Sequence, residues 1–142
     1  MSAWFDNGVL RVQVPSGWAI FRGIDSECRI TDKKVHVFKD AKLETDIFTH
    51  AGITVCFFGK QDYYVSPRFF YDDVVDKEAF TLGAHRWEGY TCTSCGYPYT
   101  MLEEHRDGCV FQVMILMKNG DREISLDDSD VREILESITQ VI

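Results

Sequence analysis

Apolar runs of strand length constrain the fold of this sequence more than any other feature. Ile53–Phe58 is apolar at all but one position and is closed by Gly59, and Val110–Met117 is a second run of this kind. Continuous apolar runs of this length are typical of strands that are buried on both faces of a sheet. We therefore expect Ile53–Phe58 to be a central strand. We expect Val110–Met117 to form a hairpin with Glu123–Leu126 through the turn-forming residues Lys118–Asp121.

The first 60 residues alternate strand-like segments with turn residues. Asp6–Gly8 precedes the alternating run Val9–Val14, and Pro15–Gly17 separates that run from Trp18–Phe21. Gly and Pro at such breaks are typical of hairpin turns, so we expect a hairpin at both places.

The end of the chain has the pattern of an amphipathic helix. Apolar residues recur with a period of 3.6 residues at Val131, Ile134, Leu135, Ile138 and Val141. Asp130 and Glu133 have the spacing of a capping box, which predicts that Asp130 caps the helix. One face of this helix is therefore expected to dock on the sheet.

Five cysteines are too many for two disulfides and too few for three. Met1–Gly8 has neither the basic start nor the apolar stretch of a signal peptide, so we expect a cytoplasmic protein with reduced thiols. Three of the cysteines fall close to a histidine, and the four together are Cys92, Cys95, His105 and Cys109. Three thiolates and one imidazole are a complete ligand set for a structural zinc ion.

The residues around this cluster favour a finger-like geometry. Gly96 allows a turn after Cys95, and Thr100 with Glu103 has capping-box spacing, which predicts a short helix from Met101. Such a helix would present His105 and the cysteine four residues later on one face. We predict one closed zinc site and no catalytic residue, because a catalytic zinc keeps a coordination position open.

Segment Tyr90–Cys109 resembles the short zinc fingers with Cys-Cys-His-Cys ligands, which are built from a knuckle and a helix. Its end, His105–Cys109, is similar to the helix of ubiquitin-binding fingers of that type, although the spacing between Cys95 and His105 is shorter here. The resemblance implies Zn²⁺ as a structural cofactor. We predict an α+β fold in one domain, residues 1–142: a mostly antiparallel sheet, a C-terminal amphipathic helix and a small zinc-binding insertion at 90–110.

The acidic balance of the chain limits its partners. A formal net charge of −8 repels nucleic acid and anionic membrane surfaces, so direct binding to either is not expected. Clustered acids and aromatic side chains are candidates for contact with another protein. The residues predicted to make this contact are Asp72, Asp73, Asp76, Tyr63 and Tyr64. The segment Tyr63–Tyr71 is expected to be extended, and Asp72–Phe80 to form a short helical turn.

These features predict a small acidic, zinc-stabilised protein-binding module without enzymatic activity. Immunity and anti-defence proteins, which inhibit other proteins by contact, are similar in size and charge. One alternative is an inhibitor that imitates nucleic acid with aligned carboxylates. Another is a small zinc-dependent hydrolase or deaminase, with a polar pocket containing His36, His50 or His85. Cys56 lies inside an apolar run, where burial raises the pKa of a thiol and makes it unreactive.

Overall fold

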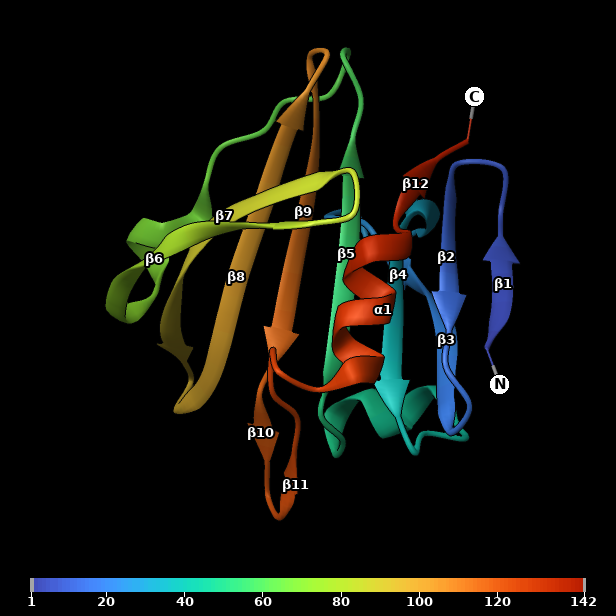
Figure 1. The fold of residues 1–142 in the computed structure, drawn as a ribbon, viewed down its shortest axis with the longest axis vertical. Coiled ribbons are helices and arrows are strands. Elements are labelled where there is room, and N and C mark those ends of the chain that lie inside the picture. Colours follow the sequence, from blue (N-terminus) through green and yellow to red (C-terminus); the bar gives the residue numbers. More distant parts are fainter. Residues whose placement is uncertain (1, 142) are drawn as a thin grey trace.

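Seven antiparallel strands form one large sheet with the order β3-β4-β5-β9-β8-β7-β6 (Figure 1). The fold is taken from a computed structural model that describes residues 2–141. The strands of this sheet are β3 (Trp18–Ile24), β4 (Ile30–Lys39), β5 (Gly52–Phe58), β6 (Asp72–Leu82), β7 (His85–Ser94), β8 (Tyr97–Arg106) and β9 (Cys109–Leu116). Shorter strands are β1 (Ala3–Asp6), β2 (Leu10–Val14) and β12 (Thr139–Gln140) in one small sheet, and β10 (Lys118–Asn119) and β11 (Arg122–Glu123) in a hairpin.

The main core lies between the large sheet and α1 (Ser129–Ser137). Val131, Ile134 and Leu135 of α1 are fully buried, and they belong to the same cluster as Val35 and Ile53 of the sheet. Strand β2 and the tip of the β6–β7 hairpin pack into this cluster as well, and Figure 1 shows that hairpin crossing the sheet toward α1. We call this side of the sheet the helix face.

The opposite side of the large sheet is covered by two irregular segments. A 3-10 turn, η1 (Glu44–Phe48), packs near Phe38 and Leu116. Residues 59–71, which include a second 3-10 turn η2 (Pro67–Phe70), connect β5 at the centre of the sheet to β6 at its edge. We call residues 59–71 the strap and this side of the sheet the strap face.

The predicted mostly antiparallel sheet with one C-terminal helix is confirmed. Ile53–Phe58 lies within β5, which is a central strand hydrogen-bonded to β4 and β9 and buried on both faces. The helix is also present, but Asp128 rather than Asp130 is its N-cap residue. The Asp130 carboxylate instead accepts a hydrogen bond from the Trp18 indole nitrogen at 3.2 Å.

Two local predictions about strands are wrong, and a third is correct only in part. Pro15–Gly17 does not make a hairpin, because it connects β2 in the small sheet to β3 in the large one. The predicted hairpin of Val110–Met117 with Glu123–Leu126 is present only next to its turn, where β10 pairs with β11 and the Ile124 N–H donates to the Met117 carbonyl at 2.9 Å. The rest of Val110–Met117 belongs to β9, which lies between β5 and β8 and pairs with both. Asp72–Phe80 is not helical, since it belongs to the long edge strand β6, which contains two bulges.

The helix predicted from Met101 is also wrong, because these residues form the long strand β8. A two-residue turn precedes β8 and another follows it. Cys95 and Gly96 have φ values of 52° and 82°, and Asp107 and Gly108 have φ values of 53° and 80°. Two successive positive φ angles are the signature of the type I′ turn, which joins antiparallel strands directly. The segment 90–110 is therefore part of the large sheet and not an insertion.

Candidate functional site

Strand β8 separates the four residues predicted to bind zinc. Cys92 is opposite Tyr99 in the β7–β8 ladder, at the end of β8 that follows the Cys95 turn. His105 is six residues further along β8, near the turn that leads to Cys109. A strand rises about 3.4 Å per residue, so roughly 20 Å of strand lie between the two pairs. Zinc ligands must all lie within about 2.3 Å of the ion.

The two candidate ligands at the far end of β8, His105 and Cys109, are not arranged to share an ion. His105 is paired with Val110, and Cys109 with Arg106, so the two side chains lie on opposite faces of the sheet. The prediction of one zinc site is therefore corrected on geometric grounds. Within residues 2–141 the structure contains no group of three or more His, Cys, Asp or Glu side chains that could hold a metal ion. All five cysteines are free, and burial raises the pKa of the Cys92 thiol.

The residues predicted to contact a partner lie in two consecutive segments, the strap and strand β6. Tyr63 and Tyr64 lie in the strap, and Asp72, Asp73 and Asp76 lie in the first half of β6, which follows it directly. Tyr63 and the three aspartates are exposed, whereas Tyr64 is half-buried.

The strap is held on the sheet at several points along its length. The Asp62 carboxylate accepts a hydrogen bond from the Gly59 backbone N–H at 2.8 Å and forms an ion pair with Lys33 at 2.8 Å. The Tyr64 ring packs on Phe58 with 4.8 Å between the ring centroids. The Tyr64 hydroxyl donates a short hydrogen bond to the Glu103 carboxylate. These contacts fix the first half of the strap.

The second half of the strap is fixed by Arg68. Its guanidinium group forms an ion pair with Asp76 at 2.6 Å and lies 5.0 Å from the centroid of the Tyr90 ring. Tyr71 then packs into a small buried cluster with Tyr90 and Met101 on the strap face. The strap is therefore an ordered segment even though it contains no strand.

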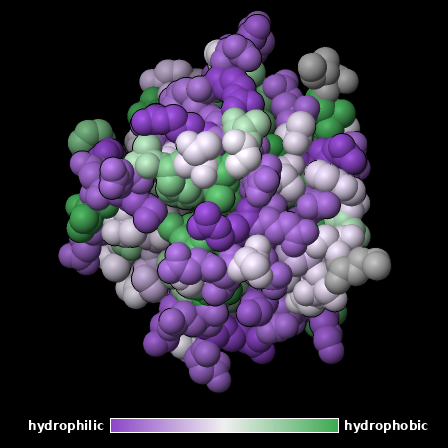
Figure 2. All heavy atoms as spheres, viewed as in Figure 1, coloured by the Kyte–Doolittle hydropathy of each residue, from purple (hydrophilic) through white to green (hydrophobic). Residues whose placement is uncertain are grey.

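Between these anchors the strap leaves large apolar side chains in solvent. Tyr63, Phe69 and Phe70 are 87%, 90% and 86% exposed. Val65 in the strap and Val75 in β6 are also exposed. We call these five residues the strap surface. Figure 2 shows apolar side chains among hydrophilic ones at the left-hand edge of the molecule, where η2 and β6 lie in Figure 1. Clusters of exposed apolar groups with polar neighbours are typical of interaction sites.

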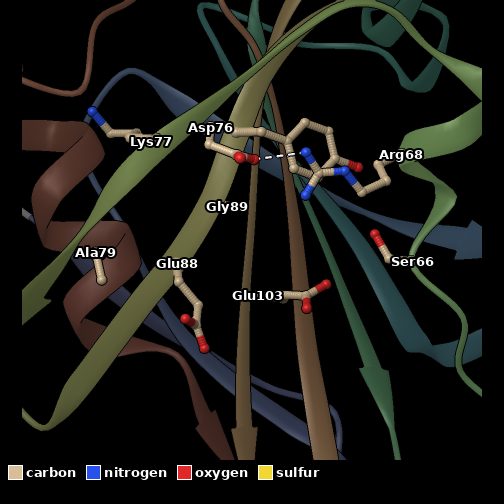
Figure 3. A pocket seen from close by; sticks show the side chains of 9 residues that line it. Ser66, Arg68, Asp76, Lys77, Ala79, Glu88, Gly89 and Glu103 are labelled. Carbon is tan, nitrogen blue, oxygen red and sulfur yellow. Dashed lines mark hydrogen bonds and ion pairs between the residues drawn. The ribbon is translucent and has the colours of Figure 1, made fainter.

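A polar cavity of about 280 Å³ lies beneath the second half of the strap. We call it the strap pocket, and its lining includes Ser66, Arg68, Asp76, Glu88, Tyr90 and Glu103. Figure 3 shows the Arg68–Asp76 ion pair at one end of this pocket, with Glu88 and Glu103 extending from the strands at the other.

Hydroxyl groups in and beside the pocket are held in their protonated form. Burial raises the pKa of Tyr90 to about 12, an effect that the nearby Ser66 hydroxyl partly opposes. Burial, together with the hydrogen bond to Glu103, raises the pKa of Tyr64 well above its ordinary value. On the same face, burial raises the pKa of the Cys56 thiol to about 11, as the sequence predicted.

Sequence reasoning missed the strap pocket because its residues come from four separate segments. Glu88 and Tyr90 alternate with Trp87 and Gly89, which indicates a strand with two different faces. Only the pairing of β7 with β8, however, places Glu103 opposite Glu88. Asp107–Gly108 was a usable signal, since Asp-Gly is a strong indicator of a type I′ hairpin. Reading it as a hairpin turn would have predicted β8 and β9 and excluded the helix at 101.

Comparison of the chain with protein-family models and with curated proteins finds no match. Among residues 2–141, no helix is long and apolar enough to cross a membrane.

Proposed function

We propose that this protein is a small non-enzymatic protein-binding module, an inhibitor or regulator that docks another protein on the strap surface. The observation that carries the proposal is the near-complete exposure of Tyr63, Phe69 and Phe70 on an anchored segment. Burying one such side chain in a partner is worth about 1.5–3 kcal/mol, and aromatic residues dominate interface energetics. This function needs no zinc ion.

The anchoring of the strap favours binding. Association costs free energy for every loop that must become ordered. Because Tyr64 and Arg68 already hold the strap on the sheet, this cost is low for the exposed aromatic side chains that neighbour them in the chain. The strap surface is therefore preorganised for contact.

The charges beside the strap surface indicate the chemistry of the partner. Asp72 and Asp73 are exposed and directly follow the strap, and the whole chain carries a net charge of −8. Complementary potentials across an interface speed association and exclude wrong partners. We infer a partner with an apolar hollow bordered by lysine or arginine side chains.

Two observations support binding over catalysis at this face. Cys56 and Tyr90, which could otherwise act as nucleophile or base, have pKa values of about 11 and 12 because they are buried. In addition, His36, His50 and His85 are all absent from the lining of the strap pocket.

The local hydrogen bonds of the clustered acidic residues favour protein docking over imitation of nucleic acid. Glu104 is buried against His85, and Glu103 accepts hydrogen bonds from Tyr64 and His105. Asp128 accepts a hydrogen bond from the backbone of Ser125. These carboxylates have local structural partners, so they do not add to a continuous acidic face.

The test is a comparison of captured proteins between matched variants. Immobilised wild-type protein, the double variant Phe69→Ala/Phe70→Ala and the control Phe48→Ala would be exposed to the same cell extract. Phe48 is 75% exposed but lies in η1, away from the strap. We expect a protein that is captured by the wild type and the control, is lost from the double variant, and is rich in exposed lysine or arginine.

Thermal unfolding of all three proteins would establish that they are equally folded, as exposed positions predict. If every captured protein is retained by the double variant, or is lost equally from the Phe48→Ala control, the strap surface is not the docking site.

A further inference from the structure

A second cavity, of about 420 Å³, lies on the strap face between the first half of the strap and the loop that joins β3 to β4. We call it the lysine pocket, and its lining includes Ile24, Lys34, Cys56, Phe58, Gln112 and Met114. Sites for small molecules have this size, and they are mostly apolar with a few polar groups that fix the ligand. The lysine pocket has this character, because its apolar side chains accompany the polar ends of Lys34 and Gln112.

Lys34 gives the pocket a positive charge that no carboxylate neutralises. It is half-buried, and it forms no ion pair with any residue in 2–141. The other charged groups of the lining have partners. Lys33 pairs with Asp62 at 2.8 Å. Asp25 accepts the backbone N–H of Arg29 at 3.0 Å and lies 3.6 Å from its guanidinium group. An anion bound in the pocket would therefore meet a cation that is still available.

The sheet fixes the position of this cation relative to Gln112. The Lys34 stem lies across Gly23, where an added Cβ would come within 2.6 Å of the lysine Cγ. Lys34 is opposite Cys56 in the β4–β5 ladder, and Cys56 is opposite Gln112 in the β5–β9 ladder. Neighbouring strands are about 4.8 Å apart, so roughly 10 Å separate the first and last backbone positions of this row. The short Cys56 side chain leaves room for a ligand group between them.

The thiol at the centre of this row does not repel an anion. Burial raises the pKa of Cys56 to about 11, an effect that the charge of Lys34 partly opposes. The thiol is therefore uncharged at neutral pH. The opposing effect also agrees with a lysine ammonium group close to the floor of the pocket.

A second, independent observation is the carboxamide of Gln112. Gln112 is 8% exposed and lines the pocket, yet its side chain has no hydrogen-bond partner within residues 2–141. Glu103 is opposite Gln112 in the β8–β9 ladder, but its two oxygens already accept hydrogen bonds from Tyr64 and His105. Buried polar groups in native proteins are normally satisfied, so a buried, unpaired carboxamide at the wall of an open pocket points to a ligand.

We propose that the lysine pocket binds a small carboxylic acid with an apolar body. The carboxylate lies above Cys56 and accepts hydrogen bonds from the Lys34 ammonium group and the Gln112 carboxamide N–H. The apolar body packs on Phe58 and Met114. A single cation matches the single charge of a carboxylate better than the nearly double charge of a phosphate group.

The binding test uses 4-phenylbutyrate as the probe and the full-length protein. The measurement is the change in the backbone amide NMR signals of Cys56 and Gln112 during titration at neutral pH. We expect saturable shifts with a dissociation constant on the order of 1 mM, while the signal of Ile134 on the helix face stays in place. The alcohol 4-phenylbutan-1-ol has the same apolar body without the charge, and it should bind at least about tenfold more weakly. Inorganic phosphate should cause no saturable shift.

Two variants and two controls make the test specific to the pocket. Lys34→Met keeps the stem across Gly23 but removes the charge, so it should weaken binding of the probe about tenfold. Gln112→Met keeps an unbranched side chain and should also weaken binding. Its melting temperature should not fall, because an unpaired buried amide does not stabilise the free protein.

The first control, Lys39→Met, removes a lysine of the same strand that lies outside the pocket lining. The second is Phe69→Ala/Phe70→Ala, since the lysine pocket shares only Tyr63 with the strap surface. Both controls should bind the probe like the wild type, so the pocket and the docking surface are tested separately. Any of four results would overturn the proposal: no saturable shift, equal binding of the alcohol, equal loss of binding in Lys34→Met and a control, or a lower melting temperature for Gln112→Met.

Discussion

His85 and Glu104 form a buried pair in which the imidazole Nδ1 lies 2.7 Å from a carboxylate oxygen. The other imidazole nitrogen donates to the Ile138 carbonyl at 2.6 Å, so this pair connects the tip of β7 and strand β8 to the end of α1. The second Glu104 oxygen accepts the Arg86 backbone N–H at 2.7 Å. One proton is thus held between the histidine and the glutamate, and every polar atom of the pair has a partner.

Removing one member of this pair should be costly. Glu104→Ala leaves the imidazole and the Arg86 N–H without their acceptor in a buried site, so we expect a loss of about 3 kcal/mol in the free energy of unfolding. Urea denaturation monitored by tryptophan fluorescence measures this loss. Glu78→Ala removes the same charge from an exposed position and should change stability by less than about 0.5 kcal/mol. Equal effects of the two substitutions would contradict the structural role of the pair.

Substitution of Cys95 is a test for which the zinc interpretation and the turn interpretation predict opposite changes in stability. Cys95 is exposed, has a φ of 52° and is followed by Gly96 at 82°. Asparagine tolerates this conformation better than cysteine, and Asn-Gly is the preferred pair in type I′ turns. Cys95→Asn should therefore stabilise the protein by roughly 0.5 kcal/mol. Were Cys95 a zinc ligand, the same variant would lose metal and stability, which native mass spectrometry and thermal unfolding would reveal.

Gly89 is required by the close approach of β7 to β8. A Cβ atom at this position would lie 1.8 Å from the Met101 carbonyl oxygen, which is backbone and has no room to shift. Gly89→Ala should destabilise the protein by about 3 kcal/mol or more. Gly59→Ala is the matched control, because its Cβ would meet the nearest atom at 3.5 Å. Chemical denaturation of the two variants tests this, and a Gly89→Ala protein as stable as Gly59→Ala would contradict the packing described.

His36 should make stability depend on pH. Burial, with a smaller contribution from Lys34, lowers the pKa of His36 from its ordinary 6.5 to about 4. Between these values the unfolded chain binds a proton that the folded protein excludes, so stability falls as the pH decreases from 6.5 to 4. Because the ring is partly exposed, we expect a contribution of about 1–2 kcal/mol.

The contribution of His36 is measured as a difference between two pH profiles. His36→Gln keeps a group that can hydrogen-bond to Thr54, which lies 2.8 Å from Nδ1 of His36, but has no proton to gain. Its melting temperature should fall less than that of the wild type between pH 7 and pH 4.5. Parallel profiles would show that the imidazole is not the group responsible.

Several elements could be predicted from the sequence because their signals are local. The helical period of Val131, Ile134 and Leu135 predicted α1, and the apolar run Ile53–Phe58 predicted β5 at the centre of the sheet. Both signals depend only on which residues must be buried. Tyr63 and Asp72, which were predicted to contact a partner, are exposed, whereas Tyr64 packs on Phe58 and is half-buried.

Strand pairing was decided only by the tertiary structure. The spacing of Cys95 and His105 allows a finger, but pairing of β8 with both β7 and β9 extends the segment and separates its ends. An extended strand rises more than twice as far per residue as a helix, so the same spacing gives either one compact site or two distant groups. Long-range pairing likewise placed Glu103 opposite Glu88 and brought both under the strap, a relationship between residues that are far apart in the chain.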